Sequence, residues 1–128
     1  MIFGIGVDVV ETRRIAESIE RLGERFLERV YQPGEIEYCR SMRAPASHFA
    51  ARFAAKEAVS KAFGTGFSNQ VNWRDIEIRR KATGEPFVVL HSGAAELAKR
   101  LGIRTIFVSL SHSDEYAVAN AVLEKETT

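Results

Sequence analysis

The stretch RFAAKEAVSKAFGTG, residues 52–66, constrains the fold of this chain more than any other feature of its sequence. It belongs to a segment that begins near Pro45 and ends at Gly64, which predicts one long helix. The alanines and phenylalanines predict that this helix packs against other elements, yet Glu57 and Lys61 lie among them. A carboxylate on an apolar helix face must be ion-paired, hydrogen-bonded or bound to a metal, because an isolated buried charge is strongly unfavourable.

The elements around this helix follow from hydrophobic spacing and turn residues. We expect an apolar strand at 2–10, helical structure at 13–30 that is either continuous or divided at Gly23, a short helix from Pro33 to about residue 41, two strands within 75–90 that turn at Thr83-Gly84, a helix at 92–101, and two strands within 103–124 around a polar turn at 111–115. This order predicts an α+β fold, in which helices cover one face of a largely antiparallel sheet.

Length and composition predict one domain over residues 1–128, because the chain is long enough for a single hydrophobic core. Its 18 basic and 17 acidic side chains nearly balance, which argues against nucleic acid as a partner. The single cysteine, Cys39, excludes an intramolecular disulfide and predicts a cytoplasmic location. Asp8 interrupts the apolar start of the chain, so we expect no membrane-spanning segment.

Asp8 is a second carboxylate in an apolar setting, because it lies within the predicted first strand. Glu57 shares a helix face with Phe53 and Lys61, and an ion pair between Glu57 and Lys61 at i,i+4 is one explanation. A single divalent cation held by Asp8 and Glu57 is the other, and oxygen ligands favour Mg²⁺, which also binds substrate phosphates. Lys56 points away from this face, where ordinary solvated charge would explain it.

Three sequence blocks, GIGVDVVETRRI, RFAAKEAVSKAFGTG and VSLSHSDEYAVANAV, resemble those of the holo-acyl-carrier-protein synthase family in order and spacing. The similarity covers almost the whole chain and includes IEI at 76–78 and GEP at 84–86. It implies the fold of the short bacterial 4'-phosphopantetheinyl transferases. It also implies transfer of the 4'-phosphopantetheine group from coenzyme A to a serine of apo acyl carrier protein, with release of adenosine 3',5'-bisphosphate.

The resemblance further implies the catalytic roles of three residues. Asp8 and Glu57 would bind Mg²⁺, or Mn²⁺ in its place, together with the coenzyme A diphosphate and water. Lys61 would neutralise charge on the phosphoryl group in transfer, which suits a reaction that depends on positioning and charge neutralisation. The proton of the serine would go to Glu57 through a metal-bound water or directly, or to a group of the carrier protein.

Coenzyme A would contact a second set of residues in this family. Arg52 and His112 would lie near the phosphates or the nucleotide end, where a forked guanidinium and an imidazole can donate hydrogen bonds. Lys61 and the loop residues Gly64, Thr65 and Gly66 would lie beside the diphosphate, because small residues let backbone amides approach it.

A basic stripe on the segment 13–30 is the predicted surface for the partner protein. Arg14, Arg21 and Arg25 point in nearly the same direction if the helix is continuous through Gly23. Ion pairing with Glu17 and Glu28 would explain the same charges, whereas the resemblance implies that they dock an acidic helix of acyl carrier protein. It also implies a homotrimer whose active sites lie at subunit boundaries.

Other interpretations of the sequence carry less weight. SLSHSDE places serine, histidine and acid in a row, but neighbours in a strand alternate faces and no nucleophile elbow is present. His48 and His91 lack companions at metal-ligand spacing and are interpreted as structural or exposed. A non-catalytic module that binds a nucleotide or a protein with the same pocket is the alternative function, and the joint presence of Asp8, Glu57 and Lys61 favours the enzyme.

Overall fold

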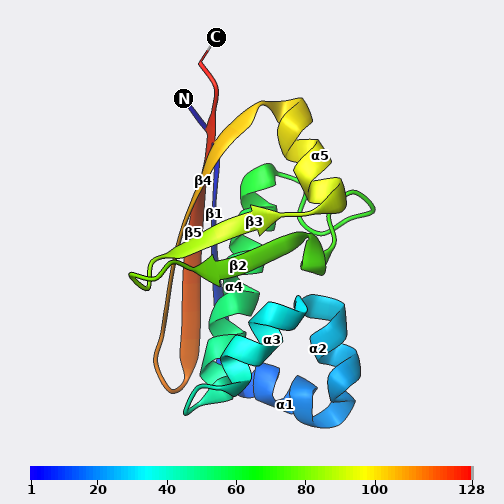
Figure 1. Cartoon of the computed structure of the whole chain (residues 1–128), viewed down its shortest axis with the longest axis vertical. Helices are drawn as coiled ribbons and strands as arrows, with labels where there is room; N and C mark the ends of the chain where they lie inside the picture. Colours follow the sequence, from blue (N-terminus) through cyan, green and yellow to red (C-terminus); the bar gives the residue numbers. More distant parts are fainter. Residues whose placement is uncertain (128) are drawn as a thin grey trace.

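The computed structural model describes residues 1–127. Figure 1 shows β1, β4 and β5 along one side of the molecule, with the helices on the other side. The elements are β1 (Ile2–Glu11), α1 (Thr12–Leu22), α2 (Glu24–Val30), α3 (Pro33–Arg40), α4 (Pro45–Phe63), a 3-10 helix (Trp73–Asp75), β2 (Ile76–Arg80), β3 (Pro86–Leu90), α5 (Ser92–Leu101), β4 (Ile103–His112) and β5 (Tyr116–Lys125).

The strands form two antiparallel sheets. β5 lies between β1 and β4 in a three-stranded sheet, and β2 pairs with β3 as a separate hairpin. In this register Asp8 of β1 lies opposite Ala119 of β5, which is buried in the core beside α4. Directly opposed residues share a face, so Asp8 points to the helical side of the sheet. The predicted α+β class with antiparallel strands is confirmed, although the predicted single sheet is divided into two.

Helix α4 is the central element of the fold (Figure 1). Its amino-terminal half packs with α1, α2 and α3, and its carboxyl-terminal half packs with β2, β5 and α5. Pro45 opens the helix in its first turn, and Gly64 ends it with φ of 87°, a left-handed conformation that glycine adopts without strain. The hydrophobic core therefore surrounds α4 on nearly all sides.

Two glycines allow β1 to lie directly against α4. A Cβ atom on Gly4 would collide with the carbonyl oxygen of Ala62, and one on Gly6 would collide with that of Ala58. Glycine is required here because the backbone of the strand touches the backbone of the helix. This close approach brings Asp8 within reach of side chains on α4.

The side chain of Lys56 is fully buried, which contradicts its interpretation from the sequence as an ordinary solvated charge. Its Nζ donates to Oε1 of Glu35 at 2.8 Å, to the carbonyl oxygen of Trp73 at 3.2 Å and to that of Ile76. Glu35 is also buried, and its Oε2 accepts from the amide of Ile78 at 3.1 Å. The prediction was wrong because α4 is covered on more than one face, so a residue that points away from the Glu57 side still enters the core.

The segment 13–30 is divided at Gly23, which has φ of 60° and separates α1 from α2. Of the two alternatives left open by the sequence, the divided helix is therefore confirmed. Arg14 and Arg21 remain together on α1, while Arg25 lies on α2. The single continuous stripe of three arginines does not form.

The three-stranded sheet has helices on one face only (Figure 1). Side chains alternate along its strands, and the large apolar residues of its other face are exposed: Ile5, Val7, Val9, Phe107 and Val118. An apolar sheet face of this kind marks an interaction surface.

Within residues 1–127, no helix is both long enough and apolar enough to span a membrane. The single domain predicted over residues 1–128 stays a prediction.

Candidate active site

A cavity of about 380 Å³ contains both of the carboxylates that the sequence singled out. β1 contributes Asp8, and α4 contributes Glu57 from the opposite wall. The remaining lining residues come from β1, α1, α2 and α4: Val9, Val10, Arg14, Ile15, Ser18, Phe26 and Phe53. The cavity therefore combines two acidic groups and one guanidinium with an apolar wall.

Lys61 lies beside this cavity and binds Asp8. Its Nζ donates to Oδ1 of Asp8 at 2.9 Å and to the carbonyl oxygen of Val7 at 3.2 Å. Lys61 is therefore paired with Asp8 and not with Glu57, the ion pair that the sequence offered as one explanation. Lys61 is half exposed, so its ammonium group remains accessible to a bound ligand.

Glu57 lies in an environment that disfavours its charge. Burial raises the pKa of Glu57, the negative charge of Asp8 raises it further, and Lys61 lowers it. Two carboxylates that face one cavity repel each other unless a cation lies between them. The electrostatics of this cavity therefore favour the binding of a positive ion.

The metal-binding atoms that this cavity offers are of the type that Mg²⁺ prefers. Asp8 and Glu57 supply only carboxylate oxygens, which are the ligands of hard cations. Within residues 1–127, no group of three or more His, Cys, Asp or Glu side chains is arranged to hold a metal. A site with two carboxylates leaves coordination positions for water and for oxygen atoms of a substrate.

Arg52 belongs to a second cavity, of about 570 Å³, between α3, α4 and the hairpin of β2 and β3. Its side chain is buried, and its guanidinium lies 4.2 Å from the centre of the Tyr38 ring. Within the described residues, neither Nε nor Nη1 of Arg52 has a hydrogen-bond partner. Arg79, Arg80 and Lys81 also line this cavity, together with Glu35 and Glu77. These two carboxylates pair with Lys56 and Arg79, which leaves the charges of Arg52 and Arg80 to attract an anion.

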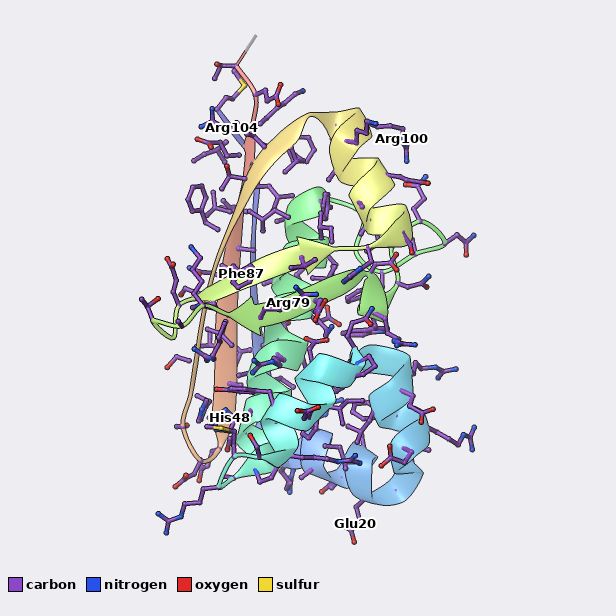
Figure 2. The ribbon with its side chains drawn as sticks, in the orientation of Figure 1. Glu20, His48, Arg79, Phe87, Arg100 and Arg104 are labelled. Carbon is purple, nitrogen blue, oxygen red and sulfur yellow. The ribbon has the colours of Figure 1, made fainter. Side chains whose placement is uncertain are left out.

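His112 lies at the end of β4, next to His48 in the first turn of α4 (Figure 2). The two ring centres are 4.8 Å apart, and Tyr38 contacts His48 from its other side with ring centres 6.0 Å apart. Tyr38 thus links His112 to the cavity of Arg52. His91 lies elsewhere, where its Nε2 is 2.8 Å from Oε1 of Glu77.

Gly64, Thr65 and Gly66 follow the carboxyl end of α4 as a turn. Gly64 and Gly66 both have positive φ, and the amide of Gly66 donates to the carbonyl oxygen of Ser60 at 3.1 Å. The Thr65 hydroxyl donates to the carbonyl oxygen of Gly66 at 2.9 Å. These three residues begin about one helical turn after Lys61, so they and Lys61 lie at the carboxyl end of α4.

On the surface of α1, Arg14 and Arg21 line a shallow cavity of about 600 Å³ together with Glu17, Ser18 and Glu20. Arg25 is not among the residues that line it. Arg14 also lines the cavity of Asp8 and Glu57. The basic side chains of α1 therefore lie at the edge of the candidate active site.

Sequence reasoning missed two groups of residues near these cavities. Tyr38 and His48 belong to no motif. Only the structure shows that Tyr38 lines the second cavity beside Arg52 and that His48 lies between Tyr38 and His112. The Glu35 and Lys56 pair was missed because its members are 21 residues apart in the chain. Their proximity depends on the packing of α3 against α4.

The chain matches the family model of the 4'-phosphopantetheinyl transferase superfamily over residues 4–121. It therefore belongs to the 4'-phosphopantetheinyl transferase superfamily, and the predicted enzyme class, a phosphopantetheinyl transferase, is confirmed. The holo-[acyl-carrier-protein] synthase of Koribacter versatilis strain Ellin345 is 52% identical over 124 residues, which cover 97% of this chain and 99% of that protein.

Solved structures of the same type are similar over nearly the whole chain. The crystal structure of holo-[acyl-carrier-protein] synthase from Neisseria meningitidis has a TM-score of 0.91 and 34% identity, and the match covers 98% of this chain and 100% of that one. The Helicobacter pylori enzyme in complex with coenzyme A has a TM-score of 0.84 and 32% identity, covering 94% and 99%. The predicted resemblance to holo-acyl-carrier-protein synthases is thus confirmed.

Proposed function

We propose that this chain transfers the 4'-phosphopantetheine group of coenzyme A to a serine of apo acyl carrier protein, in a Mg²⁺-dependent reaction that releases adenosine 3',5'-bisphosphate. The meeting of Asp8 and Glu57 at one cavity, with Lys61 bound to Asp8 beside it, carries this proposal. A similar solved enzyme holds coenzyme A, which supports the choice of donor.

Asp8 and Glu57 hold the metal in this proposal. The ion supplies charge neutralisation at the diphosphate of coenzyme A and makes its phosphorus easier to attack. The raised pKa of Glu57 and the like charge of Asp8 support the assignment, because a cation between these carboxylates removes their repulsion. Asp8 and Glu57 would be the two ligands from this chain, which would leave coordination positions for the diphosphate and water.

The remaining steps involve groups of this chain. The serine oxygen forms a bond to the phosphorus that carries pantetheine, the bond from that phosphorus to the bridging oxygen breaks, and the bisphosphate leaves with the bridging oxygen. Lys61 turns from Asp8 to the transferred phosphoryl group, whose charge it neutralises. The serine proton goes to Glu57, directly or through water, or to a group of the carrier protein.

The cavity of Arg52 binds the nucleotide end of coenzyme A. A buried guanidinium with two unpartnered nitrogen atoms is an unusual feature of a folded protein, and an anionic phosphate satisfies it with charge-assisted hydrogen bonds. Gly64, Thr65 and Gly66, which follow Lys61 at the carboxyl end of α4, lie beside the diphosphate. His112 reaches the same nucleotide end from β4.

Acyl carrier protein docks on α1 through Arg14 and Arg21, where complementary charge speeds encounter and sets orientation. Arg25 contributes from α2 at the margin of this surface. A substitution of Arg21 tests docking more cleanly than one of Arg14, because Arg14 also lines the cavity of Asp8 and Glu57.

The assembly is a homotrimer in which active sites lie at subunit boundaries. The apolar face of the three-stranded sheet supports contact with further copies of this chain, since five large apolar side chains are exposed on it. The predicted cytoplasmic location stays a prediction.

The proposal is tested by intact-mass spectrometry of apo acyl carrier protein after incubation with this chain and coenzyme A. With Mg²⁺ present, we expect the carrier protein to gain the mass of phosphopantetheine, and excess chelator should abolish the gain. If the carrier protein gains this mass equally fast in excess chelator, the metal dependence is refuted. No gain with any of several carrier proteins would instead favour a non-catalytic binding module.

A further inference from the structure

The ring of Tyr38 lies at the centre of a cluster of cationic and hydrogen-bonding side chains that come from separate elements. The guanidinium of Arg52 lies 4.2 Å from its centre and that of Arg80 lies 6.0 Å away. His48 contacts the edge of the same ring, and His112 contacts His48. Helix α4 supplies Arg52 and His48, β2 supplies Arg80, and β4 supplies His112.

Part of this cluster lacks hydrogen-bond partners, although Arg80 donates to the carbonyl oxygen of Gly84 at 2.6 Å. Within residues 1–127, no hydrogen bond or ion pair joins the ring nitrogens of His48 or His112 to another group, and Nε and Nη1 of buried Arg52 are also unpartnered. Buried polar groups of folded proteins are almost always hydrogen-bonded. The two unpartnered nitrogen atoms of buried Arg52 therefore indicate the place of an anionic ligand, and His48 and His112, which are not fully buried, lie beside it.

We infer that His48 is a further ligand-binding residue, which joins Arg52, Arg80 and His112 in holding a phosphate group at the nucleotide end of coenzyme A. The inference rests on the proposed function for the identity of the nucleotide, and it adds a residue that the sequence motifs do not contain. Figure 2 shows His48 at the start of α4, beside the lower ends of β4 and β5.

The charges around His48 give this role a characteristic proton dependence. Burial lowers the pKa of His48, and the positive charges of His112, Arg52 and Arg80 lower it further. These groups come from β4, α4 and β2, and the uncharged ring of Tyr38 packs from α3. A phosphate dianion in the cluster reverses the sign of the local field, so it raises the pKa of His48 and the histidine takes up a proton.

NMR titration of the His48 imidazole tests this directly in the wild-type chain. The pKa is measured without ligand, with saturating adenosine 3',5'-bisphosphate and with adenosine, which carries no phosphate. We expect the bisphosphate to raise the pKa by about one unit and adenosine to leave it unchanged. His48→Gln assigns the signal, because the variant lacks it.

Calorimetric binding of adenosine 3',5'-bisphosphate at pH 8 and pH 6 gives a second readout. The quantity compared is the dissociation constant of His48→Gln divided by that of the wild type. This ratio should increase about three- to tenfold from pH 8 to pH 6, because only the wild type gains a positive charge at position 48. Taking this ratio removes the titration of the phosphate itself, which affects both proteins equally. Arg100→Gln is the control, because Arg100 is exposed on α5 and lines neither of the two cavities.

The outcomes separate this inference from the proposed function. Tight binding of the bisphosphate with no change in the His48 pKa, or with a pH-independent ratio, overturns the role of His48 and leaves the transferase intact. No binding of the bisphosphate by the wild type overturns both the nucleotide assignment and the inference.

Discussion

Glu57 is a side chain at which stability and activity are expected to conflict. Its pKa is raised in the folded chain, so folding becomes less favourable as the pH rises from the unfolded pKa to the folded pKa. Above that window the ionised carboxylate is destabilising, whereas below the unfolded pKa it has no effect. Solvent screening keeps the effect small because the side chain is only partly buried.

We therefore predict that Glu57→Gln abolishes transfer and yet raises the melting temperature at pH 7.5, by about 2 °C. At pH 4 the melting temperatures of the variant and the wild type should converge, because the wild-type carboxyl is then protonated. Calorimetric melting and the intact-mass assay measure the two effects. A variant with normal transfer would contradict the assignment of Glu57 as a metal ligand.

Lys56 and Glu35 form a buried ion pair that holds α4 against α3 and β2. Removing one partner of such a pair leaves an uncompensated charge in the core. Lys56→Met should therefore lower the free energy of unfolding by about 3–5 kcal/mol. Adding Glu35→Gln to this variant should restore part of the loss, since the amide oxygen can still accept from Ile78. Urea unfolding of both variants measures the difference, and equal losses would show that the pair is not coupled.

The sequence predicted individual site residues where a local rule was enough. Asp8 and Glu57 were recognised because each is an acid in an apolar segment, and the structure brings both to one cavity. Lys56 was misassigned because helical spacing shows which residues share a face but not how many faces are covered. His48 was left as structural or exposed because its partners are contributed by α3 and β4.

At the scale of elements, the contact between β1 and α4 determines the geometry of the site. The sequence predicted the strand and the helix, and Gly4 and Gly6 inside the strand are typical of a backbone that lies close to another element. Which element approaches could not be predicted, because strand periodicity does not identify the partner of a sheet face. The division of the strands into two sheets was also not predictable, since strand pairing joins segments that are distant in sequence.

Gly6→Ala tests this contact. A Cβ atom would collide with the carbonyl oxygen of Ala58, so the strand must move away from the helix, at a cost of about 1–3 kcal/mol. The shift separates Asp8 from Glu57 and Lys61, and we expect the rate of transfer to fall more than the affinity for coenzyme A. Steady-state kinetics and urea unfolding give the two values.

Gly34→Ala is the matched control, because Gly34 lies in α3 with only ordinary van der Waals contact available to a Cβ atom. Alanine should stabilise the helix by up to about 1 kcal/mol. The comparison concerns stability alone, because Gly34 also lines the cavity of Arg52. If Gly6→Ala behaves in the same way as Gly34→Ala, the close approach is not required.

At the scale of the whole molecule, the exposed face of the three-stranded sheet predicts assembly. Phe107 is 54% exposed on this face, and Phe107→Arg places a charge where further copies of the chain would pack. We expect this variant to sediment as a monomer and to lose transfer activity, because the proposed trimer places the active sites at subunit boundaries. Glu96→Arg on α5, which is also exposed, should leave the wild-type trimer unchanged. A wild-type chain that sediments as an active monomer would contradict the assembly.

The joint binding of a metal by Asp8 and Glu57 is the central claim, and Mn²⁺ binding followed by electron paramagnetic resonance in the presence of coenzyme A tests it most directly. The wild type should bind about one Mn²⁺ per chain, with coenzyme A strengthening the binding because the diphosphate supplies ligands. Asp8→Asn combined with Glu57→Gln should abolish this site while coenzyme A still binds through Arg52. Equal Mn²⁺ binding by the double variant would contradict the account and return Asp8 to a simple ion pair with Lys61.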